Sequence, residues 1–275
     1  DYLLGVSDET RLGGTRFSID GIFQSPQDKG VPTTVALGDL LNAAQRIESG
    51  NETDEDLMMI FAPGSSLGGA RPKASVYDQH GNLLIAKFPK TQDEYSVERW
   101  EAIAMDMAKA SGIEVANYGL ENAGDQIVYL SRRFDRIVSG DDCHRIPFMS
   151  AMAVTEHNDG DDDCSYLELV DAINERGAQP EKDRCELFRR MAFSILISNT
   201  DDHLRNHGFI LTNDGWRLSP AFDLNPSVEK TGLALNIDMH SNALDLDLAK
   251  SVGVYFRLSE KEMNIIIDEV KSSVS

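Results

Sequence analysis

The chain has 275 residues, of which 41% are hydrophobic and 26% charged, and its formal net charge at pH 7 is −20. This composition is that of a soluble globular protein, and no apolar run is long enough to span a membrane. So acidic a surface repels nucleic acid, which argues against DNA binding without a basic partner or a local basic patch. The three cysteines are widely spaced, so they predict reduced cytoplasmic thiols and neither a disulfide framework nor a zinc site.

Residues 1–130 have the pattern of a lobe that contains both strands and helices. Apolar residues recur at helical spacing in two stretches, and alternating or continuous apolar runs mark the strands. The expected helices are 34–49 and 96–111, and the expected strands are 74–77, 83–88 and two within 117–130. The acidic stretch 51–56 is typical of a loop.

A Gly/Ser-rich segment, APGSSLGGARPK over 62–73, leads into the first predicted strand. Glycines such as Gly68 let backbone N–H groups approach a phosphate closely, and the hydroxyls of Ser65 and Ser66 add hydrogen-bond donors. The segment therefore has the composition of a loop that folds over nucleotide phosphates, with Lys73 at its end. An ordinary flexible loop has the same composition, so the segment alone leaves both interpretations open.

Lys87 lies inside the apolar strand LLIAKF. Because lysine is rarely buried without a partner, it either points to water from an edge or is a cation aimed at nucleotide phosphates. In kinases such a lysine is held by a helix carboxylate, and Glu98 and Glu101 lie one turn apart on the following helix. We expect Glu101 to hold Lys87, with Glu98 as the alternative; both can also be solvated helix glutamates.

Beyond Ile137 helical patterns predominate. The expected helices are 165–176, 182–197 and 258–270. Ser165, with Glu168 three residues later, predicts a capping box at the start of the first of them. Residues 158–163, NDGDDD, resemble a Ca²⁺ loop only superficially, because the glutamate that ends such a loop is missing. We interpret this acidic segment as solvated.

The segment 198–224 contains three residues with the spacing of a phosphoryl-transfer site. Asp201 and Asn206 form a D-x-x-x-x-N pattern, and Asp223 follows a short apolar pair. A kinase needs a carboxylate that accepts the proton of the substrate hydroxyl, and an amide and a second carboxylate that bind Mg²⁺. The pattern therefore predicts a kinase active site. The same residues, with Asp202, can also cap a helix and shape a turn.

Five segments together resemble the HipA-type serine/threonine kinases of bacterial toxin–antitoxin systems. The matching segments are GSSLGGARPK (64–73), LLIAKFP (83–89), SRRFDR (131–136), SNTDDHLRNHGF (198–209) and LSPAFDLNPS (218–227). They extend over most of the chain, and their combination is more specific than any one of them. Long members of this family begin with an extra strand-rich domain that no segment here represents. We therefore expect either a fragment of a longer kinase or a separate polypeptide that supplies that domain.

The resemblance implies an α+β, bilobal protein-kinase-like fold, with a strand-containing N-lobe over 1–130 and an all-helical C-lobe over 131–275. It implies ATP and Mg²⁺ as cofactors. The implied site residues are Asp201 as catalytic base, Asn206 and Asp223 as Mg²⁺ ligands, Lys87 on the ATP phosphates, and Arg132 and Phe134 near adenine. It also implies autophosphorylation of Ser66, with Ser65 as a second candidate. His203 lies in the motif at the nucleotide site, and we expect it to hold the loop and not to bind a metal.

The resemblance predicts an ATP-dependent serine/threonine protein kinase that arrests growth. Its expected substrates are itself and a translation component such as an aminoacyl-tRNA synthetase, and its expected partner is a small helix-turn-helix antitoxin through which alone it contacts DNA. One alternative is a pseudokinase that acts as a co-repressor by binding a DNA-binding antitoxin. The complete set of polar catalytic residues gives no reason to prefer it. A second alternative is a kinase of the same fold with a lipid or other substrate, and the acidic surface argues against a lipid.

Overall fold

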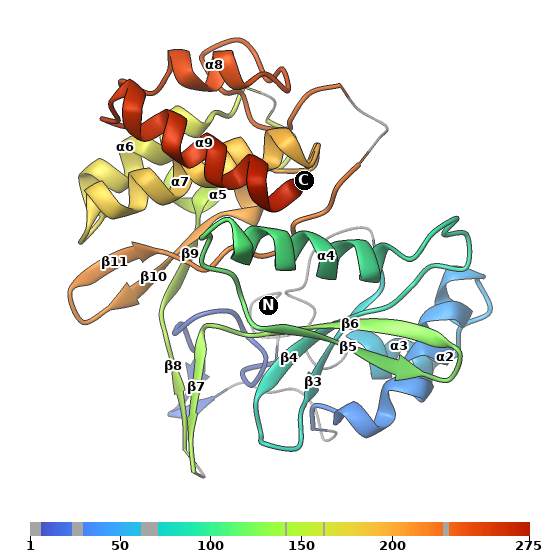
Figure 1. Cartoon of the computed structure of the whole chain (residues 1–275). Helices are drawn as coiled ribbons and strands as arrows, with labels where there is room; N and C mark the ends of the chain where they lie inside the picture. Colours follow the sequence, from blue (N-terminus) through green and yellow to red (C-terminus); the bar gives the residue numbers. More distant parts are fainter. Residues whose placement is uncertain (1–6, 24–29, 62–70, 141, 162, 228–230) are drawn as a thin grey trace. The chain divides into compact units, whose positions relative to one another are not determined.

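The computed structural model describes residues 7–23, 30–61, 71–140, 142–161, 163–227 and 231–275. The chain divides into two compact units, shown with their elements in Figure 1. Unit one is Asp1–Ala102 and Ala116–Pro147; unit two is Ile103–Val115 and Phe148–Ser275. The boundary expected after Leu130 lies inside unit one, because the hairpin that follows is tied to the N-terminal segment of the same unit by buried hydrogen bonds.

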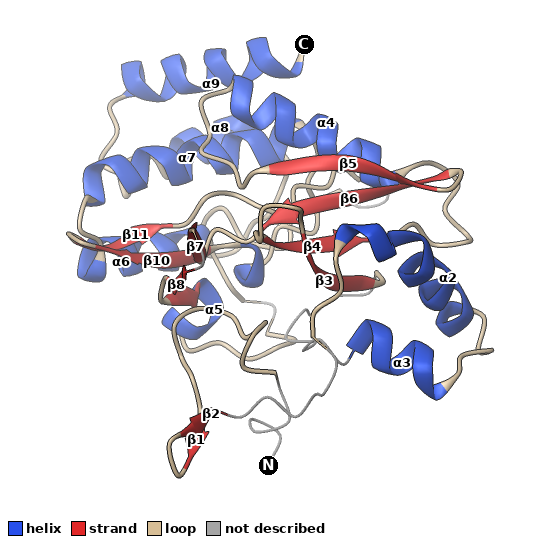
Figure 2. Cartoon of the chain, turned by 90° about the horizontal axis from the view of Figure 1, so that it is seen from below, coloured by secondary structure: helices blue, strands red, loops and turns tan. Residues whose placement is uncertain are grey.

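A four-stranded antiparallel sheet in the order β3–β4–β6–β5 is the centre of unit one (Figure 2). Its strands are β3 (Lys73–Tyr77), β4 (Leu83–Lys87), β5 (Tyr118–Ala123) and β6 (Gln126–Arg132), where the sequence predicts them. The other elements of this unit are β1 (Ser18–Ile19), β2 (Ile22–Phe23), η1 (Thr34–Ala36), α2 (Leu37–Glu48), α3 (Asp54–Phe61), β7 (Arg136–Ser139), β8 (Asp142–Arg145) and the first part of α4 (Val97–Ala110).

The helices α2 and α3 share a hydrophobic core with the sheet, to which they contribute side chains such as Leu40 and Ile60. The sequence predicts a loop over 51–56, and this prediction is wrong for its last three residues, where α3 begins. The acidic first turn of α3 suits the positive end of a helix dipole, so its charge marks a helix start and not a loop.

Alternation along β4 gives its two faces different roles. Ala86 lies in the core with α2 and α3, so Lys87 points from the opposite face. The strand register places Lys87 beside Lys73 of β3 and Tyr129 of β6, and these three side chains therefore emerge on one face. Glu101, in the part of α4 that belongs to unit one, reaches the same face, because it forms an ion pair with Lys87.

A buried carboxylate joins the start of β7 to the N-terminal segment. Asp135 is fully buried and accepts hydrogen bonds from Arg133 Nη2 at 2.6 Å, Arg136 Nη1 at 2.8 Å and the backbone N–H of Gly13 at 2.7 Å. Arg136 also donates to the carbonyl of Arg11 at 2.5 Å. One carboxylate thus pairs with two buried guanidinium groups, which would be costly to bury without it.

Unit two contains both helices and strands. Its helices are the rest of α4, α5 (Ala151–Val154), α6 (Tyr166–Arg176), α7 (Pro180–Leu196), η2 (Leu204–Asn206), α8 (Leu246–Ser251) and α9 (Glu260–Val274). Its strands are β9 (Phe148–Ser150), β10 (Gly208–Thr212) and β11 (Gly215–Leu218). The capping box predicted at Ser165 and Glu168 is present at the start of α6. Within the ranges that the structure describes, no helix combines the length and the apolar character needed to cross a bilayer.

The three strands of unit two contradict the expectation of an all-helical C-lobe. They form an antiparallel sheet in the order β11–β10–β9, with Gly208 opposite Ser150. A Cβ added at Gly208 would lie 2.4 Å from the ring of Phe148, so the glycine is required for β9 to pair here. Strands of three to five residues carry too little periodic signal to be predicted beside long helices.

We expect Asp135→Asn to lower the free energy of unfolding by about 3–5 kcal/mol, because it leaves two buried guanidinium groups without their counter-charge. Urea unfolding of the purified chain measures this change. Asp125→Asn, in the exposed turn between β5 and β6, is the matched control and should stay within about 0.5 kcal/mol of the parent. Equal stability of both variants would show that the buried network does not stabilise unit one.

Candidate active site

The loop with the candidate catalytic residues begins directly at the end of α7. Ser198 has a φ of 55°, in the left-handed region, and turns the chain out of the helix. The backbone N–H of Asn199 donates to the carbonyl of Ser194 at 2.9 Å, and its side-chain amide donates to the Ser194 hydroxyl at 3.4 Å. A long buried helix therefore fixes where the loop starts.

Asp202 is the buried anchor of this loop. Its carboxylate accepts hydrogen bonds from the Tyr166 hydroxyl and from Ser194 Oγ at 3.0 Å, and His207 Nε2 lies 2.8 Å from its Oδ1. Burial favours the neutral acid, but His207 and the two hydroxyl donors outweigh it, so the pKa of Asp202 stays below its ordinary value. Burial and the neighbouring carboxylate raise the pKa of Tyr166, which keeps its hydroxyl protonated as a donor.

Asp201 differs from its neighbour because its side chain is exposed. The side-chain amide of Asn206 donates to the Asp201 backbone carbonyl at 3.0 Å, which closes the loop between the two ends of the D-x-x-x-x-N pattern. The backbone N–H of His203 donates to the same carbonyl at 3.0 Å. Because the amide nitrogen of Asn206 is used in this way, its oxygen is the atom left to act as an acceptor or ligand.

His203 lies inside this closed loop. Its backbone carbonyl accepts a hydrogen bond from the N–H of Asn206 at 2.8 Å. Its ring Nδ1 is buried and has no hydrogen-bond partner among the residues that the structure describes. These backbone contacts do not test the role predicted for the His203 side chain, whose ring leaves one buried nitrogen available for a further contact.

Asp223 lies in a second loop that runs beside the first. It has a φ of 60°, and its Oδ1 accepts a hydrogen bond from the side-chain amide of Asn225 at 2.9 Å. The backbone N–H of Asn225 donates to Asn199 Oδ1 at 3.4 Å, and that of Ser227 donates to the Ser198 carbonyl at 2.9 Å. These bonds hold the segment 223–227 against the start of the catalytic loop, so unit two brings Asp201, Asn206 and Asp223 onto two adjoining loops.

Unit one holds the remaining predicted residues. Lys87 and Glu101 are 8% and 2% exposed, and their Nζ and Oε1 atoms are 2.5 Å apart. Glu98 does not make this contact; its Oε1 lies 2.9 Å from Arg71, which also pairs with Asp93. The helix α4 thus presents two buried glutamates to two different cations, and Glu101 is the one that reaches the strand lysine.

The SRRFDR segment separates into two sets of side chains. Arg133 and Asp135 are buried in the ion network of unit one, whereas Arg132 and Phe134 are partly exposed. Alternation therefore leaves the two residues expected near adenine outside that network. Ser65, Ser66 and Gly68 lie outside the described residues, and Lys73 is the first residue of β3.

The sequence did not reveal the anchor of the catalytic loop. Tyr166, Ser194, Asp202 and His207 come from α6, α7, the loop and the start of the unit-two sheet, and their contacts are visible only in the fold. One signal was present. Ser194 interrupts the apolar run MAFSIL of α7, and a hydroxyl on a fully buried helix face needs a polar partner.

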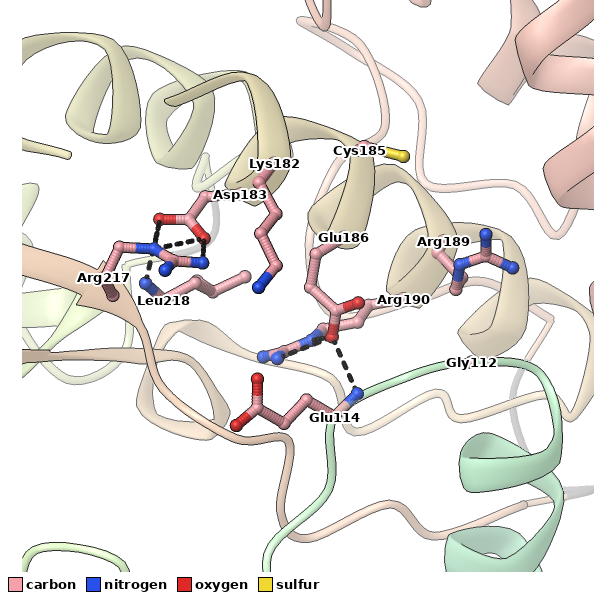
Figure 3. A pocket seen from close by; sticks show the side chains of 10 residues that line it. All are labelled: Gly112, Glu114, Lys182, Asp183, Cys185, Glu186, Arg189, Arg190, Arg217 and Leu218. Atoms are coloured by element: carbon pink, nitrogen blue, oxygen red, sulfur yellow. Dashed lines mark hydrogen bonds and ion pairs between the residues drawn. The ribbon is translucent and has the colours of Figure 1, made fainter. Parts of the chain in front are cut away.

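A cavity of about 320 Å³ in unit two contains none of the predicted site residues (Figure 3). It lies between the first half of α7, residues 112–114 and β11. Its wall is closed by ion pairs of 2.8 Å between Arg217 and Asp183 and between Arg190 and Glu186. Four of the charged side chains that line the cavity pair with one another. We therefore interpret the cavity as a junction between elements and not as the nucleotide site.

The elements form a mixed helix-and-sheet protein, and its fold is of the protein-kinase-like type. Two solved structures support this class. HipA of Shewanella oneidensis MR-1, from a complex of the HipA–HipB toxin–antitoxin system with operator DNA, matches with a TM-score of 0.74 and 18% identity over 96% of this chain and 67% of that chain. The kinase CtkA of Helicobacter pylori matches with a TM-score of 0.50 and 14% identity over 73% of this chain and 89% of that chain. At these identities the likeness shows the fold, and it confirms the predicted fold class.

The chain belongs to the HipA-like C-terminal domain family, whose model matches residues 65–275. Among curated relatives, it is 24% identical over 207 residues to "Putative kinase Y4mE" of Sinorhizobium fredii. That alignment covers 70% of this chain and 48% of the relative, so the chain spans about half the length of this protein. The resemblance deduced from the five sequence segments is therefore confirmed at the level of the family.

We expect Tyr166→Phe to lower the free energy of unfolding by about 1.5–3 kcal/mol, because it removes a buried hydrogen bond to a charged carboxylate. Thermal or urea unfolding measures the change. Tyr255→Phe, at a side chain that is 57% exposed, is the matched control and should have no measurable effect. If the two variants were equally stable, Asp202 would not be the anchor of the loop.

Proposed function

We propose that the chain is an ATP-dependent serine/threonine protein kinase of the HipA type. The observation that carries this proposal is the pair of adjacent aspartates, of which Asp202 is a buried anchor and Asp201 is exposed at the end of a closed loop. Membership of a family with relatives named as kinases supports it.

The proposed chemistry assigns the proton transfer to Asp201. Its exposed carboxylate would accept the proton of the substrate hydroxyl as that oxygen attacks the γ-phosphorus of ATP. The hydrogen bond from Asn206 to the Asp201 carbonyl fixes the backbone from which this carboxylate projects. The carboxylate is therefore oriented by the loop and not by burial, which leaves it accessible to a protein substrate.

Asn206 and Asp223 form a donor set that fits Mg²⁺. Both offer oxygen atoms, which this hard cation prefers, and few protein ligands suffice when substrate phosphates complete the coordination. The side-chain amide of Asn206 already donates through nitrogen, so its oxygen is the coordinating atom. When bound, the ion would neutralise negative charge on the phosphates.

Lys87 and Lys73 supply positive charge on one face of the unit-one sheet. They face each other across β3 and β4, a pairing of like charges that is unfavourable without an anion nearby. Glu101 offsets the charge of Lys87 and holds its side chain in place. An ATP phosphate would supply further negative charge on this face, so we assign the two lysines to nucleotide binding.

We infer the proposed partners from the same family. The HipA of Shewanella oneidensis forms a complex with HipB and operator DNA. A chain with a net charge of −20 favours association with a basic protein, and we propose a small helix-turn-helix antitoxin in this role. A translation component, such as an aminoacyl-tRNA synthetase, is the proposed protein substrate, and Ser66 is the proposed site of autophosphorylation.

We expect Asp201→Asn to lower phosphoryl transfer by about 10²–10⁴-fold, because the change keeps the shape of the side chain but removes the base. ATP binding should be nearly unchanged. Incubation with γ-labelled MgATP, followed by mass spectrometry of the loop serines and of added cell extract, measures the transfer.

Asp214→Asn, in the exposed turn between β10 and β11, is the control and should transfer phosphate like the parent. Label on lipid instead of protein would favour the lipid-kinase alternative. Absence of label in the parent, with ATP bound, would favour a pseudokinase. Undiminished transfer by Asp201→Asn would contradict the assignment of the base.

We expect Glu101→Gln to raise KM for ATP and to lower kcat, together by up to about 10²-fold in kcat/KM, because a misplaced phosphate clamp both binds and orients poorly. Glu98→Gln, one turn away, acts on Arg71 and not on Lys87, so its effect should be smaller. Steady-state kinetics of both variants measure the difference. A larger loss for Glu98→Gln would mean that the Lys87–Glu101 pair has no part in nucleotide binding.

A further inference from the structure

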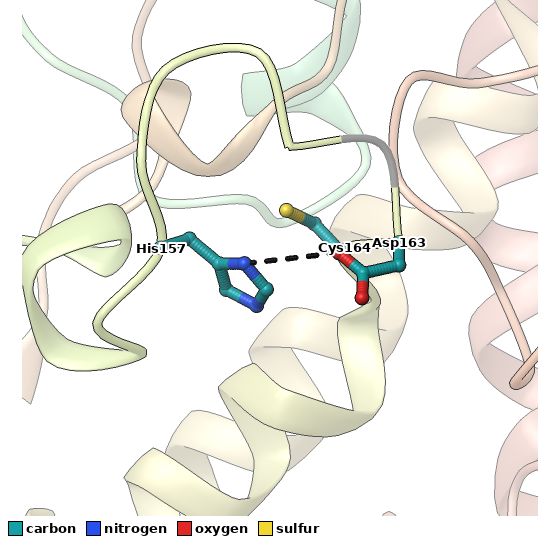
Figure 4. A group of neighbouring side chains, drawn as sticks. All are labelled: His157, Asp163 and Cys164. Atoms are coloured by element: carbon teal, nitrogen blue, oxygen red, sulfur yellow. Dashed lines mark ion pairs between the residues drawn. The ribbon is translucent and has the colours of Figure 1, made fainter.

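The segment between α5 and α6 brings together a histidine, a cysteine and carboxylates (Figure 4). Each of His157, Asp163 and Cys164 offers one ligand atom, and these three atoms lie within 4.8 Å of one another. His157 Nδ1 is 3.9 Å from Asp163 Oδ1 and 3.1 Å from Asp161 Oδ2. The cysteine spacing argued against a zinc site, but the fold places one cysteine beside a histidine seven positions earlier in the chain, which spacing between cysteines cannot reveal.

The other nitrogen of this histidine is held in the manner of a metal ligand. His157 Nε2 lies 2.7 Å from Glu168 Oε1. The second oxygen of Glu168 accepts a hydrogen bond from the backbone N–H of Ser165 at 2.8 Å, as part of the helix cap. Metal-binding histidines usually donate their second ring N–H to a carboxylate that fixes the tautomer and the ring orientation. The cap of α6 therefore holds the imidazole ring of His157 so that its Nδ1 can face Asp163 and Cys164.

The arrangement needs only a small adjustment to coordinate an ion. Metal–ligand bonds of about 2.0–2.3 Å give ligand–ligand separations of about 3.3–3.8 Å in a tetrahedral site. The side chain of Asp163 is 83% exposed, so its carboxylate can turn toward the other two ligands without disturbing a packed neighbour. Cys164 is buried at 7% exposure, and His157 is 15% exposed, so these two ligands are already positioned by the fold.

We propose that His157, Asp163 and Cys164 bind one transition-metal ion of the Zn²⁺ class. The chemistry of the donors selects this class. Imidazole and thiolate suit Zn²⁺ and Co²⁺, whereas Mg²⁺ and Ca²⁺ prefer sites made of oxygen alone. The site is thus chemically distinct from the Mg²⁺ site proposed at Asn206 and Asp223, and the inference does not depend on the proposed kinase activity.

The proposed metal site lies in the segment that contacts the loop 198–206 through an ion pair. Asp159, inside the same segment, forms an ion pair with Arg205, the residue before Asn206. Both partners of this pair are largely exposed, with side chains 77% and 46% accessible, so the pair alone holds the segment weakly. A metal bound two to five residues away would restrict the segment and with it the position of Asp159.

Titration of the metal-free full-length chain with Co²⁺ alone tests the proposal, because a cobalt–thiolate bond gives a charge-transfer absorption band that carboxylates do not. We expect the band to saturate at one Co²⁺ per chain and to disappear when Zn²⁺ displaces it. Cys164→Ser should abolish the band, and Cys185→Ser and Cys143→Ser, at the other two free thiols, should retain it.

Two further variants keep the test decisive if Cys164→Ser folds poorly. Asp163→Asn changes an exposed side chain and should weaken Zn²⁺ binding, measured by competition with a chelating dye. Glu168→Gln keeps the helix cap, since glutamine also serves there, and should lower Zn²⁺ affinity by about 10–100-fold. The proposal is overturned if the parent shows no cobalt–thiolate band, if Cys164→Ser retains it, or if Asp163→Asn and Glu168→Gln bind Zn²⁺ like the parent.

Discussion

The buried carboxylate of Asp202 holds together the loop on which the candidate chemistry depends. Burying a charge is costly unless it is paired and hydrogen-bonded, and here Tyr166, Ser194 and His207 supply these contacts from three different elements. Because the anchor fixes one side chain of the loop inward, the neighbouring Asp201 faces outward. The two adjacent aspartates therefore have opposite environments, one suited to stability and the other to reaction with a substrate.

A second constraint acts on unit one. Successive side chains of β4 point to opposite faces of the sheet, so one face packs in the core and the other carries the candidate site residue. Ala86 lies in the hydrophobic core, and Lys87 emerges on the opposite face, where Glu101 meets it. Burial of this lysine and glutamate is less costly because each neutralises the other. The same hairpin thus stabilises the sheet through one face and positions a cation through the other.

The sequence predicted most of the helices and strands but not the buried contacts that hold the loops in place. The helices α4, α6, α7 and α9 and the four strands of unit one have clear periodicity, and local patterns suffice to find them. The strands of unit two were missed, although Asn213, Asp214 and Gly215 give a turn signal between β10 and β11, because runs of three to five residues carry little periodicity beside long helices. The contacts of Asp202 join α6 and α7 to the loop, so no local pattern shows them in full. His157, Asp163 and Cys164 are close in the chain, but the sequence does not show that their side chains meet. The roles assigned to Asp201, Asn206, Asp223 and Lys87 stay predictions.

The most direct test of the proposed nucleotide-binding residues is amide hydrogen exchange of the chain with and without MgATP. We expect slower exchange around Lys87 and within 198–206 and 223–227, because these are the residues assigned to the phosphates and Mg²⁺. Omitting Mg²⁺ should remove most of the protection at Asp223. Unchanged exchange in all of these segments at saturating MgATP would contradict the proposed kinase function.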